Sequence, residues 1–147
     1  MAEPVKTLIM RAIVEAVTAI PMVGSVKRNP PTPPKRETAI FPAVYVYDDT
    51  ESKMNNNRYS KNTFPVQIET YFLADDEDAS EEAELIDSEI YKVVLKDPAL
   101  LALINSITPE AGSSSSKQFL DEFTGVLISR YVVVYQHKYG DPTDQAK

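Results

Sequence analysis

Few residues of this chain have side chains that could carry out acid–base or nucleophilic chemistry. The 147-residue sequence contains one histidine, His137, and no cysteine. A nucleophile activated by an imidazole can therefore be built only around His137. His137 lies near the end of the segment "GVLISRYVVVYQHKY", where strand alternation places it beside Tyr135. We predict that His137 is a surface or sheet-edge residue rather than a catalytic base.

The largest group of chemically capable side chains is the acidic run Asp75–Glu89, which holds nine Asp and Glu residues and no Lys or Arg. Carboxylate oxygens are the ligands that Ca²⁺ prefers, and the stretch "DDEDASEE" contains enough of them. It lacks, however, the D-x-[DN]-x-[DN]-G order whose glycine makes the sharp turn of a calcium loop. No phosphate-binding glycine motif and no HExxH sequence occurs. We interpret the run as a solvated helix face and expect a non-enzyme without cofactor or metal.

The composition fits a single domain without membrane segments. We place this domain at residues 1–140 and expect a flexible tail at residues 141–147. No apolar run approaches the roughly 20 residues of a membrane span, and charged Lys6 and Arg11 interrupt the apolar N-terminal segment. We therefore expect a soluble protein made in the cytoplasm. The net charge of −7 argues against a surface that grips nucleic-acid phosphates.

Two helices and about four strands are needed to hold these side chains. Apolar residues at i, i+3 and i+4 predict helices over Pro4–Ala19 and Ser80–Leu95, the second with an acidic outer face and Ser80 as N-cap. Asp97 and Pro98 predict a short further turn. Strands are expected at 22–28, 43–47, 64–74 and 126–136. The order predicts a small α+β domain with a mixed or antiparallel sheet, in which strands 43–47 and 64–74 pair antiparallel.

The connections between these elements differ in character. The segment "NPPTPPKRE" holds four prolines and predicts a stiff extended connector, with a recognition peptide as the alternative. The segment Thr50–Asn62 predicts a polar loop too long for a tight hairpin. Its positive charges, amides and exposed aromatic suit protein contact, and they would also suit weak contact with a phosphate backbone. The remaining alternative is a mobile solvated loop. The expected partner-binding residues are Lys53, Met54, Asn56, Arg58, Tyr59 and Lys61.

The predicted strand Val126–Gln136 is apolar on both faces. Its eleven residues span about 36 Å, whereas a sixteen-residue helix spans about 24 Å. If one helix covers each face of the sheet, the strand is longer than the helix that covers it, and part of its apolar surface stays exposed. We therefore expect an oligomer, with Tyr131, Val133 and Tyr135 at the contact between subunits.

The order of these segments resembles the tail terminator proteins of long-tailed bacteriophages, the lambda tail terminator among them. The resemblance runs from about Val5 to Pro142 and rests on an amphipathic N-terminal helix, "FPAVYVYDD", a polar loop, "FPVQIETYFLA", an acidic helix and "LISRYVVVYQHKYGDP". The similarity lies in the order of these segments and in their residue composition, and none of them is a motif exclusive to the family. The Pro-rich segment and the Ser-rich segment near Ser113 have no counterpart in it.

This resemblance implies a ring-forming structural subunit of the virion. A homohexameric ring would cap the tail tube, end its polymerisation and provide the interface to the head–tail connector protein. Partners would be sister subunits, the tail tube protein and the connector. DNA would pass through the lumen without specific binding, and an acidic chain suits such passage.

Two alternatives fit the same sequence. Another phage neck or head-completion ring protein would share the size and the structural role. An acidic binding module or DNA mimic would instead use the Asp75–Glu89 face and act as a monomer or dimer.

Overall fold

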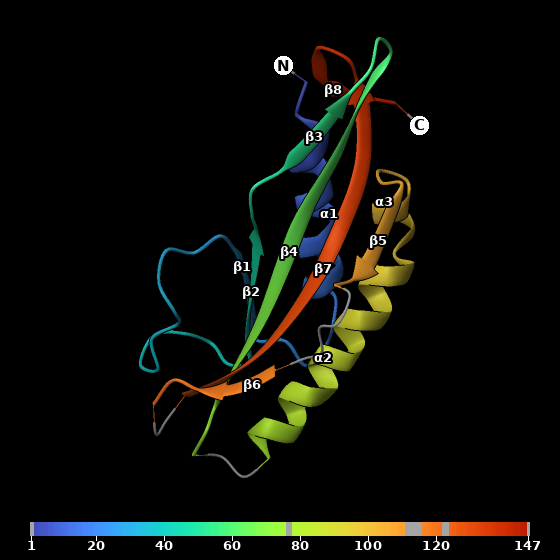
Figure 1. Ribbon diagram of the computed structural model, residues 1–147. Coiled ribbons are helices and arrows are strands. Elements are labelled where there is room, and N and C mark those ends of the chain that lie inside the picture. Colours follow the sequence, from blue (N-terminus) through green and yellow to red (C-terminus); the bar gives the residue numbers. More distant parts are fainter. Residues whose placement is uncertain (1, 76–77, 111–115, 122–123, 147) are drawn as a thin grey trace.

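The computed structural model describes residues 2–75, 78–110, 116–121 and 124–146. Over these residues the chain forms three helices and one eight-stranded sheet (Figure 1). The helices are α1 (Val5–Thr18), α2 (Ala79–Lys96) and α3 (Pro98–Leu101). The strands are β1 (Ser25–Arg28), β2 (Ala43–Asp48), β3 (Ser52–Asn55), β4 (Tyr59–Leu73), β5 (Ser106–Pro109), β6 (Ser116–Phe119), β7 (Thr124–Lys138) and β8 (Asp141–Gln145).

Two long antiparallel strands form the centre of the sheet. Strands β4 and β7 have 15 residues each and pair from Tyr59–Lys138 to Leu73–Thr124, so that they run the height of the molecule (Figure 1). The strand order is β1-β2-β4-β7-β5, with β3 added to β4 and with β6 and β8 added to β7. Only the β1–β2 pair is parallel among these described strands, so the sheet is mixed.

The expected sheet of about four strands with two main helices is wrong in size, although the α+β class is right. The additional strands β3, β5, β6 and β8 have only four or five residues each. Strands β3 and β8 are polar and are held by pairing with β4 or β7, whereas β5 also buries Ile107 in the core and the Phe119 ring of β6 packs against Phe72. Strand β8 also occupies most of the expected flexible tail, residues 141–147.

The helix predictions hold to within one or two residues. Helix α1 follows Pro4 directly, and α2 begins after Asp78 rather than after Ser80. The short α3 is capped by Asp97, whose Oδ2 accepts from the backbone N–H of Leu100 at 2.9 Å. The calcium alternative included residues 76–77, and the Ser-rich segment included residues 111–115; both stretches lie outside the described residues.

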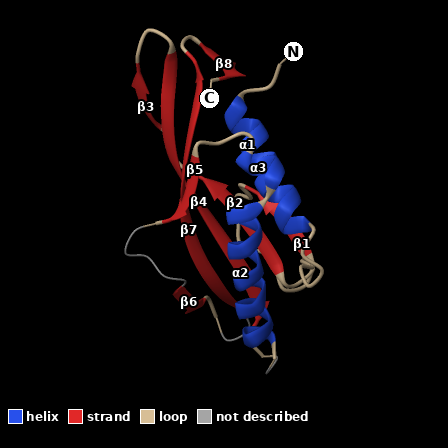
Figure 2. Ribbon diagram, turned by 90° about the vertical axis from the view of Figure 1, so that its right-hand side faces the viewer, coloured by secondary structure: helices blue, strands red, loops and turns tan. Residues whose placement is uncertain are grey.

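Both long helices pack on the same face of the sheet. Figure 2 shows α1 above α2, with the two helices following the length of the long strands β4 and β7. The main core joins them through fully buried side chains such as Ile13 of α1, Ile90 of α2 and Phe64 of β4. The expectation of one helix on each face is therefore wrong. No helix of the described residues lies over the opposite face of the sheet, which is called here the open face.

Candidate functional site

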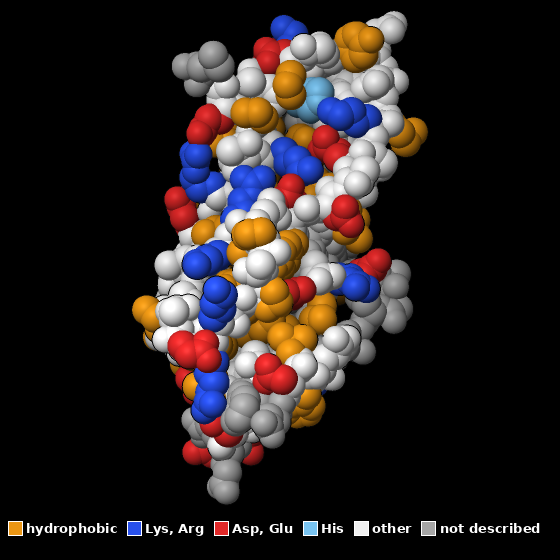
Figure 3. All heavy atoms as spheres, turned by 90° about the vertical axis from the view of Figure 1, so that its left-hand side faces the viewer, with side chains coloured by type: hydrophobic (Ala, Val, Ile, Leu, Met, Phe, Trp, Pro, Cys, Tyr) orange, Lys and Arg blue, Asp and Glu red, His pale blue; other side chains and the backbone are white. Residues whose placement is uncertain are grey.

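The open face carries alternate residues of β2, β4 and β7. Its end near Leu73 is closed by a second apolar cluster, in which Ala43, Tyr45, Tyr71 and Val126 are at most 4% exposed. Farther along the strands, Pro65 and its cross-strand neighbour Val132 are only half-buried. Apolar side chains also gather on the side of the molecule nearest β1, with Lys and Arg along one margin (Figure 3). Apolar surface is thus left over outside the core.

The expected loop Thr50–Asn62 is instead a β-hairpin, formed by β3 and the first residues of β4. We call residues 52–63 the β3–β4 hairpin. Its turn follows Asn56, whose Oδ1 accepts from the backbone N–H groups of Arg58 and Tyr59 at 2.7 and 2.8 Å. This side-chain cap substitutes for a backbone turn and lets a polar sequence close a short hairpin. The sequence interpretation missed it because no apolar alternation marks β3.

The hairpin brings together all six residues predicted to bind a partner: Lys53, Met54, Asn56, Arg58, Tyr59 and Lys61. Tyr59 is half-buried and the other five are exposed, Met54 to 74%. Residues 52–63 include three basic side chains and no acidic one. Lys53 lies 3.5 Å from Glu51, whereas Arg58 and Lys61 have no ion pair with any described residue. The binding role of this hairpin stays a prediction.

The three residues expected at a subunit contact lie inside the chain's own core. Tyr131, Val133 and Tyr135 are 2%, 0% and 3% exposed and point toward the helices. The hydroxyl of Tyr135 donates to a carboxylate oxygen of Glu51. Burial, followed by this hydrogen bond, raises the pKa of Tyr135 well above its ordinary value. These side chains are covered because both helices pack on their face, so they offer no surface to a neighbour.

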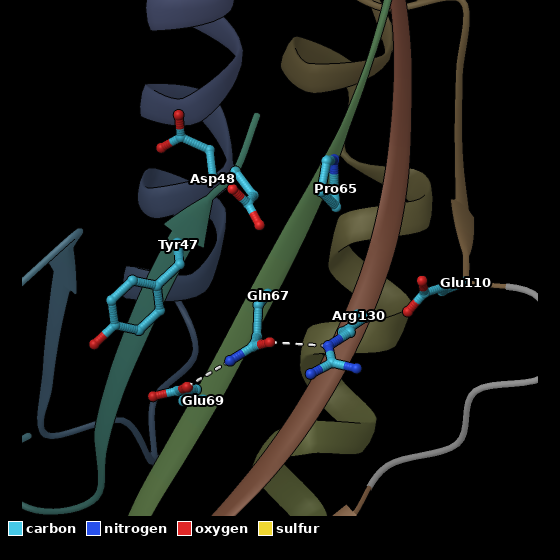
Figure 4. A pocket seen from close by; sticks show the side chains of 8 residues that line it. Tyr47, Asp48, Pro65, Gln67, Glu69, Glu110 and Arg130 are labelled. Carbon is cyan, nitrogen blue, oxygen red and sulfur yellow. Dashed lines mark hydrogen bonds between the residues drawn. The ribbon is translucent and has the colours of Figure 1, made fainter. Parts of the chain in front are cut away.

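A hollow of about 560 Å³ lies on the open face between β2 and β7 (Figure 4). We call it the sheet hollow. It is lined by Tyr47, Asp48, Asp49, Pro65, Gln67, Glu69, Glu110 and Arg130. Its floor comes from β4 and β7, its sides from the end of β2 and from the residue that follows β5. The lining mixes apolar side chains with four carboxylates and one guanidinium.

A chain of hydrogen bonds crosses the floor of the sheet hollow. Arg130 Nε donates to Gln67 Oε1 at 2.9 Å, and Gln67 Nε2 donates to Glu69 Oε2 at 2.6 Å (Figure 4). The hydroxyl of Tyr71 donates to Glu69 Oε1 at 2.5 Å. Burial, together with nearby Glu69 and Tyr45, raises the pKa of Tyr47 to about 12. The hydroxyls of Tyr47 and Tyr71 are therefore neutral near pH 7.

Asp48 belongs to a different network at the rim, on the helix side of β2. Its carboxylate lies 3.3 Å from Lys6 Nζ and 3.4 Å from Arg28 Nε, and its Oδ1 accepts from Asn29 at 2.7 Å. Burial alone would raise the pKa of Asp48, but the Asn29 hydrogen bond and the charges of Arg28 and Lys6 lower it overall. Asp48 thus ties α1 and β1 to β2, and its charge is already balanced.

His137 is not the surface residue that the sequence predicted, because it is only 4% exposed. It packs beside Tyr135 as alternation indicated, with ring centroids 6.3 Å apart. Nδ1 lies 2.8 Å from the carbonyl oxygen of Lys138, while Nε2 has no hydrogen-bond partner within the described part of the chain. Strand β8 pairs with β7 at this point, which explains the burial.

The described residues contain no group of three or more His, Cys, Asp or Glu side chains placed to hold a metal ion. Within the same ranges, no helix is long and apolar enough to cross a bilayer. A scan against protein-family models found no matching family, and a search of curated proteins found no similar protein.

The sheet hollow was not predicted from the sequence, although one feature of the hollow was predicted, the polar residues on one face of β4. The alternation of buried Phe64, Val66 and Ile68 with Gln67 and Glu69 predicts a partly polar second face on β4, and the structure confirms it. Arg130 interrupts the apolar alternation of β7 in the same way. What the sequence lacked was the register that sets Arg130 opposite Gln67 across β4 and β7.

Proposed function

We propose that this chain is a structural subunit that assembles head-to-tail into a closed ring, of the kind that terminates and caps a phage tail tube. The observation that carries the proposal is the placement of both long helices on one sheet face. That placement leaves the part of the open face around Pro65 and Val132 only half-buried, and it leaves the β3–β4 hairpin at the far end of the central strands. One subunit therefore has two unlike surfaces available for assembly.

Unlike surfaces on identical subunits favour a ring. A contact that joins two different patches repeats from one copy to the next, and it closes when the rotation per subunit divides a full turn. A dimer with two-fold symmetry would instead bury the same patch on both subunits. The proposed ring would be a hexamer by resemblance to tail terminators, with the tube protein and a head–tail connector as its other partners.

The charge distribution supports a lumen that lets DNA pass. The chain carries a net charge of −7, and a phosphate backbone is bound mainly through clustered Lys and Arg. The same distribution gives less support to a DNA mimic. Within the acidic helix, Glu84 accepts from Lys117 at 2.5 Å and Glu89 from Lys92 at 3.1 Å. Partners within the chain thus already occupy part of the negative surface that a mimic would present.

The test is tube capping. The purified chain would be added to a phage tail tube protein from the same source while the tube polymerises, and tube lengths would be measured by negative-stain electron microscopy. We expect shorter tubes with a ring of extra density at one end. Tubes of unchanged length without end density would contradict the proposal. A particle lacking the chain should carry overlong or aberrant tails, whereas detached tails of normal length would indicate another neck protein.

A further inference from the structure

We propose that one end of the open face contacts the phosphate backbone of duplex DNA, weakly and without sequence preference. This surface, called here the basic end, lies where β3 and the end of β7 flank β4, far from the start of α2 (Figure 1). It consists of Met54, Arg58, Tyr59, Lys61, Lys138 and Tyr139. The inference rests on the proposed function, in which DNA passes through the ring, and it names the surface of each subunit that faces the DNA.

The register of the strands places two cations of the basic end on one side of the sheet. Tyr59 lies directly opposite Lys138, and Met54 lies directly opposite Lys61. Residues directly opposite each other project to the same side, and so do residues two apart on one strand. Lys61 and Lys138 are therefore diagonal neighbours, with their backbones about 7–8 Å apart. They lie on the open face, because Lys61 alternates in step with Pro65 along β4.

The turn of the β3–β4 hairpin adds a third cation. Arg58 is exposed, and its carbonyl oxygen accepts from the backbone N–H of Tyr139 at 3.1 Å. Tyr139 is itself 57% exposed. Arg, Lys and Tyr side chains are among the groups that proteins use to contact the phosphates and sugars of DNA. The basic end therefore has the composition of a backbone-contacting surface.

The positive charge of this surface is not balanced within the described part of the chain. Arg58, Lys61 and Lys138 form no ion pair with any described residue. Residues 52–68 and strand β7 contain no Asp or Glu. An anion bound between Lys61 and Lys138 would offset the repulsion between them, and DNA supplies such anions at close spacing.

The nearest carboxylates are held by other partners. Glu51 accepts from the hydroxyl of Tyr135, which points toward the helices. Asp141 accepts from the hydroxyl and the backbone N–H of Thr143 at 2.6 and 3.0 Å. These hydrogen bonds, followed by the charge of Lys138, lower the pKa of Asp141. Strand β8 thus brings negative charge to the outer edge of β7, which weakens the basic end without neutralising it.

The net charge of −7 does not cancel this surface, because the acidic helix begins at the opposite end of β4. Phe72 of β4 packs with Ala79 and Ala83 of α2. The strand from Tyr59 to Phe72 spans about 43 Å at roughly 3.3 Å per residue. Charges at the protein surface are screened over about 8 Å at physiological salt. The N-terminal turns of α2 are therefore several screening lengths away from the basic end.

Binding of DNA to charge variants of the chain tests the inference. The basic-end variant carries Arg58→Gln, Lys61→Gln and Lys138→Gln. The matched control carries Lys27→Gln, Lys35→Gln and Lys96→Gln, which remove the same three charges at exposed positions outside the basic end. The probe is a fluorescein-labelled DNA duplex of mixed sequence, titrated with each chain and followed by fluorescence anisotropy at about 50 to 200 mM salt. Sedimentation velocity gives the number of subunits in the binding species.

Three phosphate contacts set the expected salt dependence. Each neutralised phosphate contributes about −0.9 to the slope of log K against log salt, so the wild-type slope should be about −2.7 per subunit. The basic-end variant should bind at least about tenfold more weakly at the lowest salt, with a slope near zero. Lys138→Gln alone should reduce the size of the slope by about 1. The control should bind as wild type, and circular dichroism verifies that every variant is folded.

Three outcomes would overturn the inference. One is a wild-type chain that does not bind DNA at the lowest salt, and another is an equal loss of binding in the basic-end variant and the control. The third is displacement of the labelled duplex by poly-L-glutamate as efficiently as by unlabelled duplex at equal charge, which would assign the basic end to an acidic protein instead.

This experiment is independent of tube capping, because it contains no tube protein. A chain that caps tubes but fails to bind DNA keeps the proposed function and loses the proposed surface. A chain that binds DNA through the basic end but leaves tube length unchanged keeps the surface and loses the proposed function.

Discussion

Gly125 lies directly opposite Phe72 across the central strands, and the Phe72 ring fills the space where a side chain at Gly125 would stand. A Cβ at this position would come within 2.3 Å of Phe72 Cζ and 2.6 Å of Cε2. Phe72 is 1% exposed and belongs to a small cluster with Ala83 of α2 and Leu127 of β7. The glycine is therefore required for close packing of the ring at the end of β7 rather than for a special backbone angle.

Gly125→Ala should lower the free energy of unfolding by about 1–3 kcal/mol, because the added methyl overpacks a filled space. Urea unfolding followed by circular dichroism measures this change. In the double variant with Phe72→Leu, the ring is gone, so the loss should be smaller than the sum of the two single losses. Strict additivity of the two substitutions would contradict the steric explanation.

Asn56→Ala should loosen the β3–β4 hairpin. The substitution removes the acceptor for two backbone N–H groups at the turn, at a cost of about 0.5–1.5 kcal/mol. Hydrogen exchange at the amides of Arg58 and Tyr59 should become faster. The neighbouring Asn57→Ala is the matched control, because Asn57 makes no side-chain hydrogen bond among the described residues. Equal exchange rates in the two variants would rule out the turn cap.

Arg58→Ala should separate assembly from stability. Arg58 is exposed and its side chain has no partner within the described ranges, so the free energy of unfolding should change by less than about 0.5 kcal/mol. Tube capping should nevertheless weaken, because the substitution removes a cation from the hairpin predicted to bind a partner. Tyr59→Ala tests the same hairpin. Normal capping by both variants would count against the hairpin as a partner-binding element.

The network around Asp48 should give the protein an acid-sensitive component of stability. The pKa of Asp48 is lowered in the folded chain, so its contribution is complete above the unfolded pKa of about 3.9 and is lost as the pH falls through the folded value. Asp48→Asn should cost about 1 kcal/mol near pH 7, since it removes two ion pairs and keeps the Asn29 contact. The difference from wild type should vanish at low pH. A difference independent of pH would contradict the electrostatic assignment.

The buried tyrosines should make the fold sensitive to alkali. Burial raises the pKa of Tyr47 to about 12, and it also raises the pKa values of Tyr71, Tyr131 and Tyr135. A raised pKa stabilises the fold fully below the unfolded value of about 10, and this stability is lost as the pH rises through the folded value. Denaturant midpoints should therefore fall above about pH 10. Tyr47→Phe should reduce the fall, and ultraviolet absorbance of tyrosinate should track it.

The elements with strong apolar periodicity were predictable from the sequence. Helices α1 and α2 follow from the spacing of apolar residues such as Ile9, Ile13 and Ile86, which are buried. The antiparallel pairing of β2 with β4 follows from the single loop segment between the two strands. The short strands were not predictable, because residues such as those of β3 are polar and gain their conformation from β4. The Asn56 turn is set by one side-chain oxygen, which no periodicity reveals.

The face of the sheet on which each helix packs could not be predicted from the sequence either. Both faces of β7 are apolar, so the sequence alone does not indicate whether a helix covers the face of Tyr131 or the face of Val132. In the structure both helices pack on the Tyr131 face. They therefore bury Tyr131, Val133 and Tyr135, the residues expected at a subunit contact. Only part of the candidate site could be predicted from the sequence. The composition of the hairpin is visible in the sequence, whereas the sheet hollow depends on the register between strands far apart in the chain.

The central ladder joins β4 to β7, and α2, α3, β5 and β6 all lie between them in the sequence. Such non-local pairing slows folding, because the long intervening chain loses conformational entropy before the contacts between the strands form. On a ribosome, β4 would emerge well before β7 and would wait with one long edge unpaired. Newly made chains should thus be most prone to aggregation before Lys138 is synthesised, and the last quarter of the polypeptide should decide the yield of native protein.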